Sequence, residues 1–340
     1  MTQPFTAGSE AFADLRNALP FRGKLHRWEH ARYAVQTLAE LAVESYQPEG
    51  IFQMSAKAAG FEGSVLLRAT KTDAEAQVAW GGGIAVVGFR GSELPKGADW
   101  RANLRDWKAD VMSAWRRPWP PYLPPGVVAG VGFRNQIVDI LPQLLFTLGK
   151  LKEDNDGKLE VFICGHSLGA ADATLAVPAL RAEEFEVPLA VAVESPRVFD
   201  EASALWYDDN FKNSAATTTY RVSNVEDGVP DIVTRVPKGW HVGTPITMTE
   251  EWLSTRPEEW NELCESNPIP ALARWRVFSR AAAGTRAHGG RRVVRRMRKH
   301  IRPIREQLTE PMTRDPRWVG FPDPEEPGGV IGATSKEPNA

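Results

Sequence analysis

Short apolar runs alternate with amphipathic segments along most of the chain. Six runs predict strands, the second of them two strands separated by glycines: 63–70, 76–91, 158–165, 188–195, 217–224 and 240–248. Three segments with apolar residues at helical spacing predict helices: 28–45, 131–151 and 168–183. Because strands alternate with helices, we expect a mostly parallel central sheet with helices on both faces, which is an α/β fold.

The alternating pattern gives way to other compositions at both ends of the chain. We expect residues 28–310 to form one α/β domain, preceded by an N-terminal extension at 1–27. Prolines and glycines make up ten of the last thirty residues. A segment of this kind buries too little apolar area to offset the entropy of ordering it, so 311–340 is predicted to be a disordered tail.

Composition and charge limit the functional classes to which the protein can belong. The 340 residues carry a formal net charge of −2, which argues against a nucleic-acid-binding protein. Two cysteines, Cys164 and Cys264, make no disulfide framework, and Cys164 is expected to pack in the core. No secretory signal and no membrane-spanning run is evident. We therefore expect a cytoplasmic protein, with export by a route that the sequence does not show as the alternative.

One stretch carries candidate chemistry. Gly165-His166-Ser167-Leu168-Gly169 fits the pattern G-x-S-x-G and lies between a predicted strand and a predicted helix. This is the context of a nucleophile elbow, in which small flanking residues allow a sharp turn that exposes the serine. The start of the helix, with the N–H of Leu168, would face a developing oxyanion. A structural serine is the alternative, since the five-residue pattern also occurs by chance.

A nucleophilic serine needs a base and an acid that orients the base. In this arrangement the chain order is serine, acid, histidine, and the acid follows a later strand. Three carboxylates stand at that place: Glu226, Asp227 and Asp231. Asp227 is favoured because it precedes Gly-Val-Pro, a stiff turn that can hold a carboxylate in place.

These stretches together resemble the class 3 lipases, the fungal-type triacylglycerol lipase family. The similarity covers roughly 30–300, through motifs that occur in the family's order: 86–92, 99–104, 165–170, 194–200, 221–230 and 241–248. The resemblance implies an α/β-hydrolase fold, ester hydrolysis and no cofactor. It aligns Asp227 with the catalytic aspartate and places Ser92, whose N–H would join that of Leu168 in the oxyanion hole, on the oxyanion loop.

The chain departs from the family pattern at two places. It has Gly-Val-Gly-Phe at 130–133 where the family often has His-x-Gly-Phe, and Glu194 replaces the glycine that usually opens Gly-Ser-Pro-Arg. We expect neither departure to touch the triad.

Six histidines are candidates for the base: His26, His30, His166, His241, His288 and His300. The first two fit a surface helix, and His166 should point away from the catalytic face, where a packing or hydrogen-bonding role is expected. His241 starts a strand and so lies at the wrong end of a parallel sheet. His288 precedes a predicted helix, as the family's base does, although Ala-His-Gly-Gly matches the family's Asp-His-Ser-Met loosely. We favour His288 over His300, which lies within that helix, because a loop can aim an imidazole more readily.

The hypothesis is a serine hydrolase of acylglycerol-type esters that acts through an acyl-enzyme. A phospholipase A1 or short-chain esterase is one alternative, and a non-catalytic protein that binds lipid or a partner is another. A lipid or ester is the expected partner. The tryptophan-rich segment 99–125 is either a lid or rim that touches a membrane surface transiently, or a loop packed on the body. The basic amphipathic segment 286–305 is expected to dock on the protein's own core, with binding to anionic lipid as the alternative.

Overall fold

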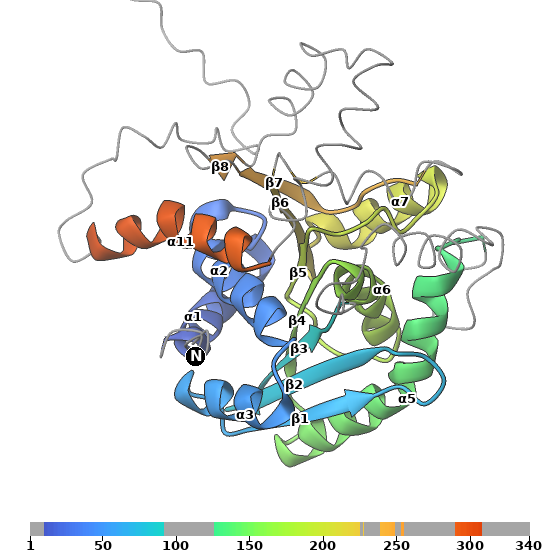
Figure 1. The fold of residues 1–340 in the computed structure, drawn as a ribbon, viewed down its shortest axis with the longest axis horizontal. Helices are drawn as coiled ribbons and strands as arrows, with labels where there is room; N and C mark the ends of the chain where they lie inside the picture. Colours follow the sequence, from blue (N-terminus) through green and yellow to red (C-terminus); the bar gives the residue numbers. More distant parts are fainter. Residues whose placement is uncertain are drawn as a thin grey trace, which may run out of the picture. The chain divides into compact units, whose positions relative to one another are not determined.

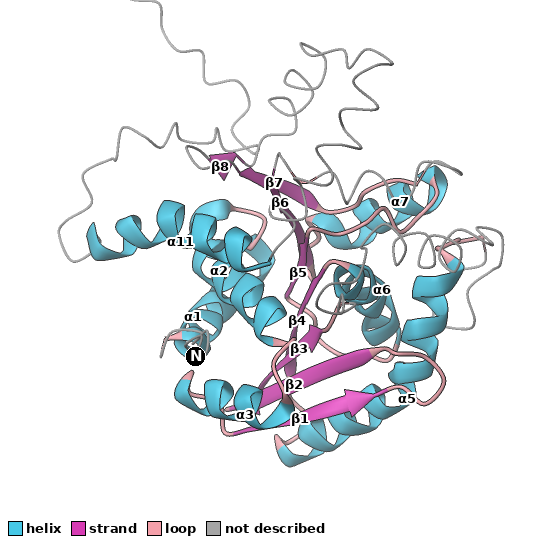
Figure 2. Cartoon of the chain, in the orientation of Figure 1, coloured by secondary structure: helices cyan, strands magenta, loops and turns pink. Residues whose placement is uncertain are grey.

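The computed structural model describes residues 10–91, 126–224, 227, 239–248, 253–254 and 290–307. Within these residues the chain builds one eight-stranded sheet whose spatial order follows the sequence. The strands are β1 (Gly63–Arg68), β2 (Glu75–Gly81), β3 (Ile84–Phe89), β4 (Glu160–His166), β5 (Leu189–Val193), β6 (Thr218–Asn224), β7 (Thr244–Met248) and β8 (Leu253–Ser254). Figures 1 and 2 show this sheet with helices on either side of it.

The centre of the sheet is parallel. Strands β3 to β7 pair in parallel with their neighbours, whereas β2 is antiparallel to both β1 and β3, and β8 is antiparallel to β7. The prediction of a mostly parallel sheet is therefore confirmed. Since parallel strands end at the same edge, the residues that follow β4, β5 and β6 all emerge at one edge of the sheet.

Helices cover both faces of the parallel strands. Figure 1 shows α2 (Trp28–Glu44) on one side and α6 (Leu168–Ala182) on the other, with α5 (Val131–Asp154) against α6. The apolar stripe of α2, including Leu38 and Leu41, is buried against the sheet, as its helical spacing predicts. Helix α6 is apolar almost all round and buried along most of its length, because it lies between the sheet and α5.

Several helical segments are present that the apolar pattern did not single out: α1 (Ala11–Ala18), η1 (Leu19–Lys24), α3 (Glu49–Ala58), α7 (Glu201–Tyr207) and η2 (Asp208–Lys212). The first two lie in the predicted extension 1–27. Their Leu15 is fully buried, and Asp14 accepts a hydrogen bond from Thr37 Oγ1 of α2 at 3.0 Å. The chain divides into the compact units Met1–Arg302 and Pro303–Ala340, and these helices lie in the first.

The last helix, α11 (Gly290–Gln307), contains most of the basic segment. Its Val293, Val294, Met297 and Ile301 are fully buried, and Arg298 Nε donates to Glu40 Oε1 of α2 at 2.7 Å. The expectation that this helix docks on the protein's own core is confirmed for these residues. No helix among the described residues is long and apolar enough to cross a membrane.

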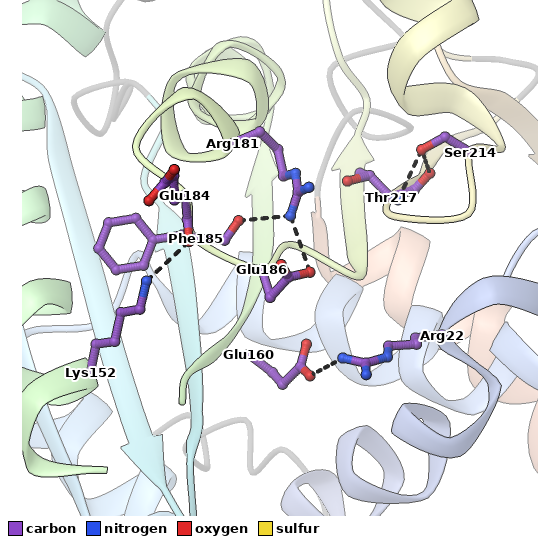
Figure 3. A network of polar contacts seen from close by, with 9 residues as sticks. All are labelled: Arg22, Lys152, Glu160, Arg181, Glu184, Phe185, Glu186, Ser214 and Thr217. Atoms are coloured by element: carbon purple, nitrogen blue, oxygen red, sulfur yellow. Dashed lines mark hydrogen bonds and ion pairs between the residues drawn. The ribbon is translucent and has the colours of Figure 1, made fainter. Parts of the chain in front are cut away.

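Polar contacts close the amino edge of the sheet (Figure 3). Arg22 of η1 pairs with Glu160 at the start of β4, at 2.7 Å. Arg181 at the end of α6 pairs with Glu186 at 3.1 Å and donates to the Phe185 carbonyl at 3.0 Å. These contacts tie the connections at this edge together, and the candidate chemistry lies at the opposite, carboxyl edge.

Candidate active site

Ser167 occupies the bend between β4 and α6. Its backbone has φ 57° and ψ −123°, a conformation that non-glycine residues rarely adopt and that is found at constrained functional positions. Its N–H donates to the Val193 carbonyl at the end of β5, at 2.9 Å. Residues on either side are buried, whereas Ser167 itself is half-buried and reaches the surface. The strand, bend and helix predicted around this serine are all present.

The two glycines of the motif allow the bend because there is no room for a side chain at either. A Cβ on Gly165 would overlap the Gly169 carbonyl, and a Cβ on Gly169 would overlap the Phe89 carbonyl of β3. The helix therefore starts directly against the ends of two strands. Leu168 is the first residue of α6, so its N–H is one of the helix-start donors that lack an intrahelical acceptor. A positive dipole end and N–H donors beside a serine can stabilise an oxyanion.

Asp227 lies just after β6 and is almost fully buried. Its N–H donates to the Asn224 carbonyl at 3.1 Å, which forms a tight turn directly after the last residue of the strand. Because β4, β5 and β6 are adjacent and parallel, the sheet brings Asp227 to the same edge as Ser167. The two other acid candidates, Glu226 and Asp231, lie outside the described residues.

Glu194 also lies at this edge, directly after β5, and its side chain is completely buried. Its Oε1 accepts from the Asn224 N–H at 2.9 Å and from Asn224 Nδ2 at 2.8 Å, and its carboxyl lies beside that of Asp227. Glu194 therefore lies against the predicted acid, contrary to the expectation that this departure leaves the predicted triad untouched. The sequence did not place the two residues together, but β5 and β6 are neighbours, so the residues that follow these strands meet at one edge.

Burial gives this carboxyl pair unusual electrostatics. Loss of hydration, the nearby Asp227 charge and the hydrogen bond with Asp227 all raise the pKa of the Glu194 carboxyl well above its ordinary value. The donors from Asn224 oppose this shift without cancelling it.

Two of the histidines lie where the sequence predicts. The His166 side chain is buried, its Nδ1 lies 3.0 Å from Tyr46 Oη, and its ring packs edge-to-face on Tyr46. The expected packing and hydrogen-bonding role is confirmed. His241 precedes β7 and so lies at the amino edge, opposite Ser167.

Of the other residues predicted for the site, some are described by the structure and some are not. His300 lies on α11 and is half-buried. His288, Ser92 and the whole tryptophan-rich segment 99–125 lie outside the described residues, as do the predicted tail 311–340 and Cys264. In the part of the chain that the structure describes, no group of three His, Cys, Asp or Glu side chains could hold a metal ion.

Residues 86–236 match the family of class 3 lipases. The resemblance to that family is confirmed. The class 3 lipase match begins in β3 and extends past β6, so it contains Ser167, Glu194 and Asp227.

Two curated relatives are the secreted mono- and diacylglycerol lipases A of Penicillium cyclopium and Penicillium camembertii. Each is 29% identical over 147 residues, which cover 43% of this chain and 42% of the relative. The match thus spans less than half the length of these relatives.

Solved structures show the fold. The Rhizomucor miehei triacylglyceride lipase aligns with a TM-score of 0.53 and 20% identity, over 70% of this chain and 89% of that chain. The Lip2 lipase of Yarrowia lipolytica aligns with a TM-score of 0.51 and 18% identity, over 63% and 77%. The predicted α/β-hydrolase fold is confirmed.

Proposed function

We propose that this chain is a serine hydrolase of carboxylic esters of the acylglycerol type, with Ser167 as the nucleophile. The observation that carries the proposal is the strained Ser167 backbone at the start of α6, between glycines that tolerate no side chain. Strain of this kind persists only where the surrounding structure imposes it. The match to class 3 lipases and the names of the Penicillium relatives support the ester and acylglycerol chemistry.

The reaction begins when Ser167 Oγ attacks the ester carbonyl while a histidine accepts its proton. The tetrahedral intermediate collapses to an acyl-enzyme and the alcohol leaves with the proton, after which water repeats the sequence and releases the acid. Asp227 orients the imidazole and stabilises its cationic form. Its buried position at the same sheet edge as Ser167 supports this role.

The Leu168 N–H and the Ser92 N–H hold the oxyanion in this proposal. Gly91, which precedes Ser92 in the chain, lies so close to the elbow that a Cβ would overlap Tyr46 Oη and contact the His166 carbonyl. Gly91 therefore lies beside the elbow, and this position supports the role proposed for Ser92, the next residue. Loss of one oxyanion donor typically lowers the rate by about 10²–10³-fold.

His288 is the proposed base, and His300 is the alternative. The family position before a terminal helix supports His288, whereas His300 would depend on how α11 docks. Transient contact of the segment 99–125 with a lipid surface and a cytoplasmic location stay predictions; the Penicillium relatives are secreted proteins by name.

Replacement of Ser167 by alanine tests the nucleophile. We expect Ser167→Ala to lower p-nitrophenyl ester cleavage by at least about 10³-fold, because the acyl-enzyme cannot form. A fluorophosphonate probe should label the wild type and not the variant, and circular dichroism should show the same fold. Ser64→Ala, on the edge strand β1, is the matched control and should keep full activity and labelling.

Turnover retained by Ser167→Ala would refute the serine assignment. The same assay on His288→Ala and His300→Ala identifies the base, and a chain-length series of esters and phospholipids separates a lipase from a phospholipase A1 or a short-chain esterase. A folded wild type that neither cleaves esters nor reacts with the probe would favour the non-catalytic alternative.

A further inference from the structure

The buried contact between Glu194 and Asp227 raises the question of how many protons the two carboxyls carry. Ionised carboxylates offer only acceptors, so two of them cannot hydrogen-bond to each other. Both side chains are buried, and two negative charges in contact there would repel strongly. A hydrogen bond between these neighbouring carboxyls therefore requires one proton on the pair.

The contacts of Asn224 show which oxygen carries that proton. Arg296 of α11 is fully buried and donates from Nη1 to Asn224 Oδ1 at 2.8 Å. This bond fixes the orientation of the Asn224 amide, so that Nδ2 faces Glu194. Glu194 Oε1 then accepts two N–H donors, whereas Oε2 is buried and receives no donor from the described residues. Oε2 is the atom left to hold a proton.

Burial decides between the two carboxyls. Glu194 is 0% exposed and Asp227 is 6% exposed, so ionisation of Glu194 loses more hydration. The charged groups near Glu194 among the described residues are the Asp227 carboxylate, in the turn after β6, and the Arg296 guanidinium, which donates to the same Asn224 amide that donates to Glu194. The nearer charge is negative and favours a neutral Glu194.

We propose that Glu194 is a neutral carboxylic acid whose Oε2–H donates to the Asp227 carboxylate and thereby positions the acid of the triad. The inference rests on the proposed function, since it takes Asp227 as the residue that orients the base. Glu194 is a positioning residue: it acts on the histidine only through Asp227. The pair carries a single negative charge, and the turn of Asp227 is held by Asn224 on one side and by Glu194 on the other.

Two substitutions separate the donor from the charge. Glu194→Gln keeps a neutral side chain with an N–H donor of the same length, so we expect kcat to stay within about threefold of the wild type. Glu194→Gly removes the donor and suits the backbone at this position, where φ is 51°. We expect it to lower kcat by about 10–100-fold with little change in KM, because Asp227 loses one of its anchors.

Two measurements report the proton itself. The infrared difference spectrum of wild type minus Glu194→Gln at neutral pH should show the carbonyl band of a protonated carboxylic acid. The buried Asp172, whose carboxyl pKa burial also raises, is present in both proteins and cancels in the difference. A carboxyl whose folded pKa is raised contributes stability that is complete below its unfolded pKa and is lost as the pH rises toward the folded pKa. The wild type should therefore lose stability relative to Glu194→Gln as the pH increases above about 4.5, the ordinary carboxyl value.

The proposal is overturned if Glu194→Gln is as inactive as Glu194→Gly, or if the carbonyl band is absent from the infrared difference spectrum of the two proteins. It is also overturned if Asp227→Asn keeps activity that Glu194→Gln loses, since Glu194 would then be the triad acid. The infrared and stability measurements need no catalysis and no folded glycine variant. Failure of the Ser167 test with the band present would thus refute the proposed function and leave the proton assignment standing.

Discussion

Ser167 and Glu194 share an uncommon backbone conformation at the ends of adjacent strands. Their φ angles are 57° and 51°, in the left-handed region that favours glycine. Such strain persists only where neighbouring contacts hold it. The Ser167 N–H donates to the Val193 carbonyl and so helps to fix this conformation. The Glu194 N–H donates to the Val222 carbonyl at 2.8 Å, and the Glu194 side chain accepts hydrogen bonds from Asn224. Both residues reach the carboxyl edge because of these bends.

The motif glycines provide a test of the bend. We expect Gly169→Ala to destabilise the protein by about 1–3 kcal/mol, because the new Cβ overlaps the backbone of β3, which cannot move cheaply. Gly149→Ala is the matched control, since this glycine lies inside α5 with nothing within 4 Å of an added Cβ, and it should stabilise by up to about 1 kcal/mol. Urea unfolding of both variants measures the difference. Equal stability of the two would contradict the tight approach of α6 to the strand.

Helices α2 and α11 show how two elements far apart in the sequence come together. The buried residues of α11 lie on one side of the helix, and its basic Arg298 meets the acidic Glu40 of α2. The hydrogen bond with Glu40 raises the pKa of the Arg298 guanidinium above its ordinary value. An apolar seam with a charged pair at its border is the arrangement expected of a helix that docks on its own core.

Truncation of a buried methionine tests that docking. We expect Met297→Ala to lower the free energy of unfolding by about 2–5 kcal/mol, because Met297 is 0% exposed and its removal leaves a cavity. The same substitution at Met54 in α3, which is 74% exposed, should change stability by less than about 0.5 kcal/mol. Chemical denaturation followed by circular dichroism compares them. A neutral Met297→Ala would mean that α11 does not pack as described.

At the scale of the whole molecule, the two edges of the sheet have different roles. The amino edge carries structural ion pairs such as Arg22 with Glu160. Ser167, Glu194 and Asp227 lie at the carboxyl edge, because they follow the adjacent parallel strands β4, β5 and β6. Between the edges, strands β3 to β6 are buried along nearly their whole length, and Cys164 in β4 is 0% exposed. Burial raises the pKa of the Cys164 thiol and makes it unreactive in the folded state.

The reactivity of Cys164 reports the opening of the whole sheet. In a Cys264→Ser variant it is the only cysteine, and we expect a thiol-reactive chromogenic disulfide to label it at least about 10³-fold more slowly than an unfolded thiol. Labelling should accelerate in step with loss of the circular dichroism signal. The variant that also carries Cys164→Ala should show no labelling. Fast labelling of the folded protein would contradict a closed central strand.

The local pattern of the sequence determined much of the fold and one part of the site. The apolar pattern placed strands β1 to β7 and helices α2, α5 and α6, and the spacing Gly165-x-Ser167-x-Gly169 indicated the bend, because these features depend on residues close together in the chain. The pattern did not predict β8, which has two residues, nor helices α1 and α3, which are short and are stabilised by packing against α2 and against β1 and β2. The roles of His288 and Ser92 stay predictions from the family resemblance.

Only the tertiary structure decided which groups surround the acid of the site. Nothing in the sequence around Glu194 indicates a contact with Asp227, and the replacement of a glycine there was expected to leave the predicted triad untouched. The contact exists because β5 and β6 are parallel neighbours, so residues that follow each strand meet at one edge. Likewise, Arg296 lies in a segment whose charge predicts a solvated face, yet docking of α11 buries it against Asn224. Proximity between distant segments is a property of strand order and helix docking, and local patterns do not encode it.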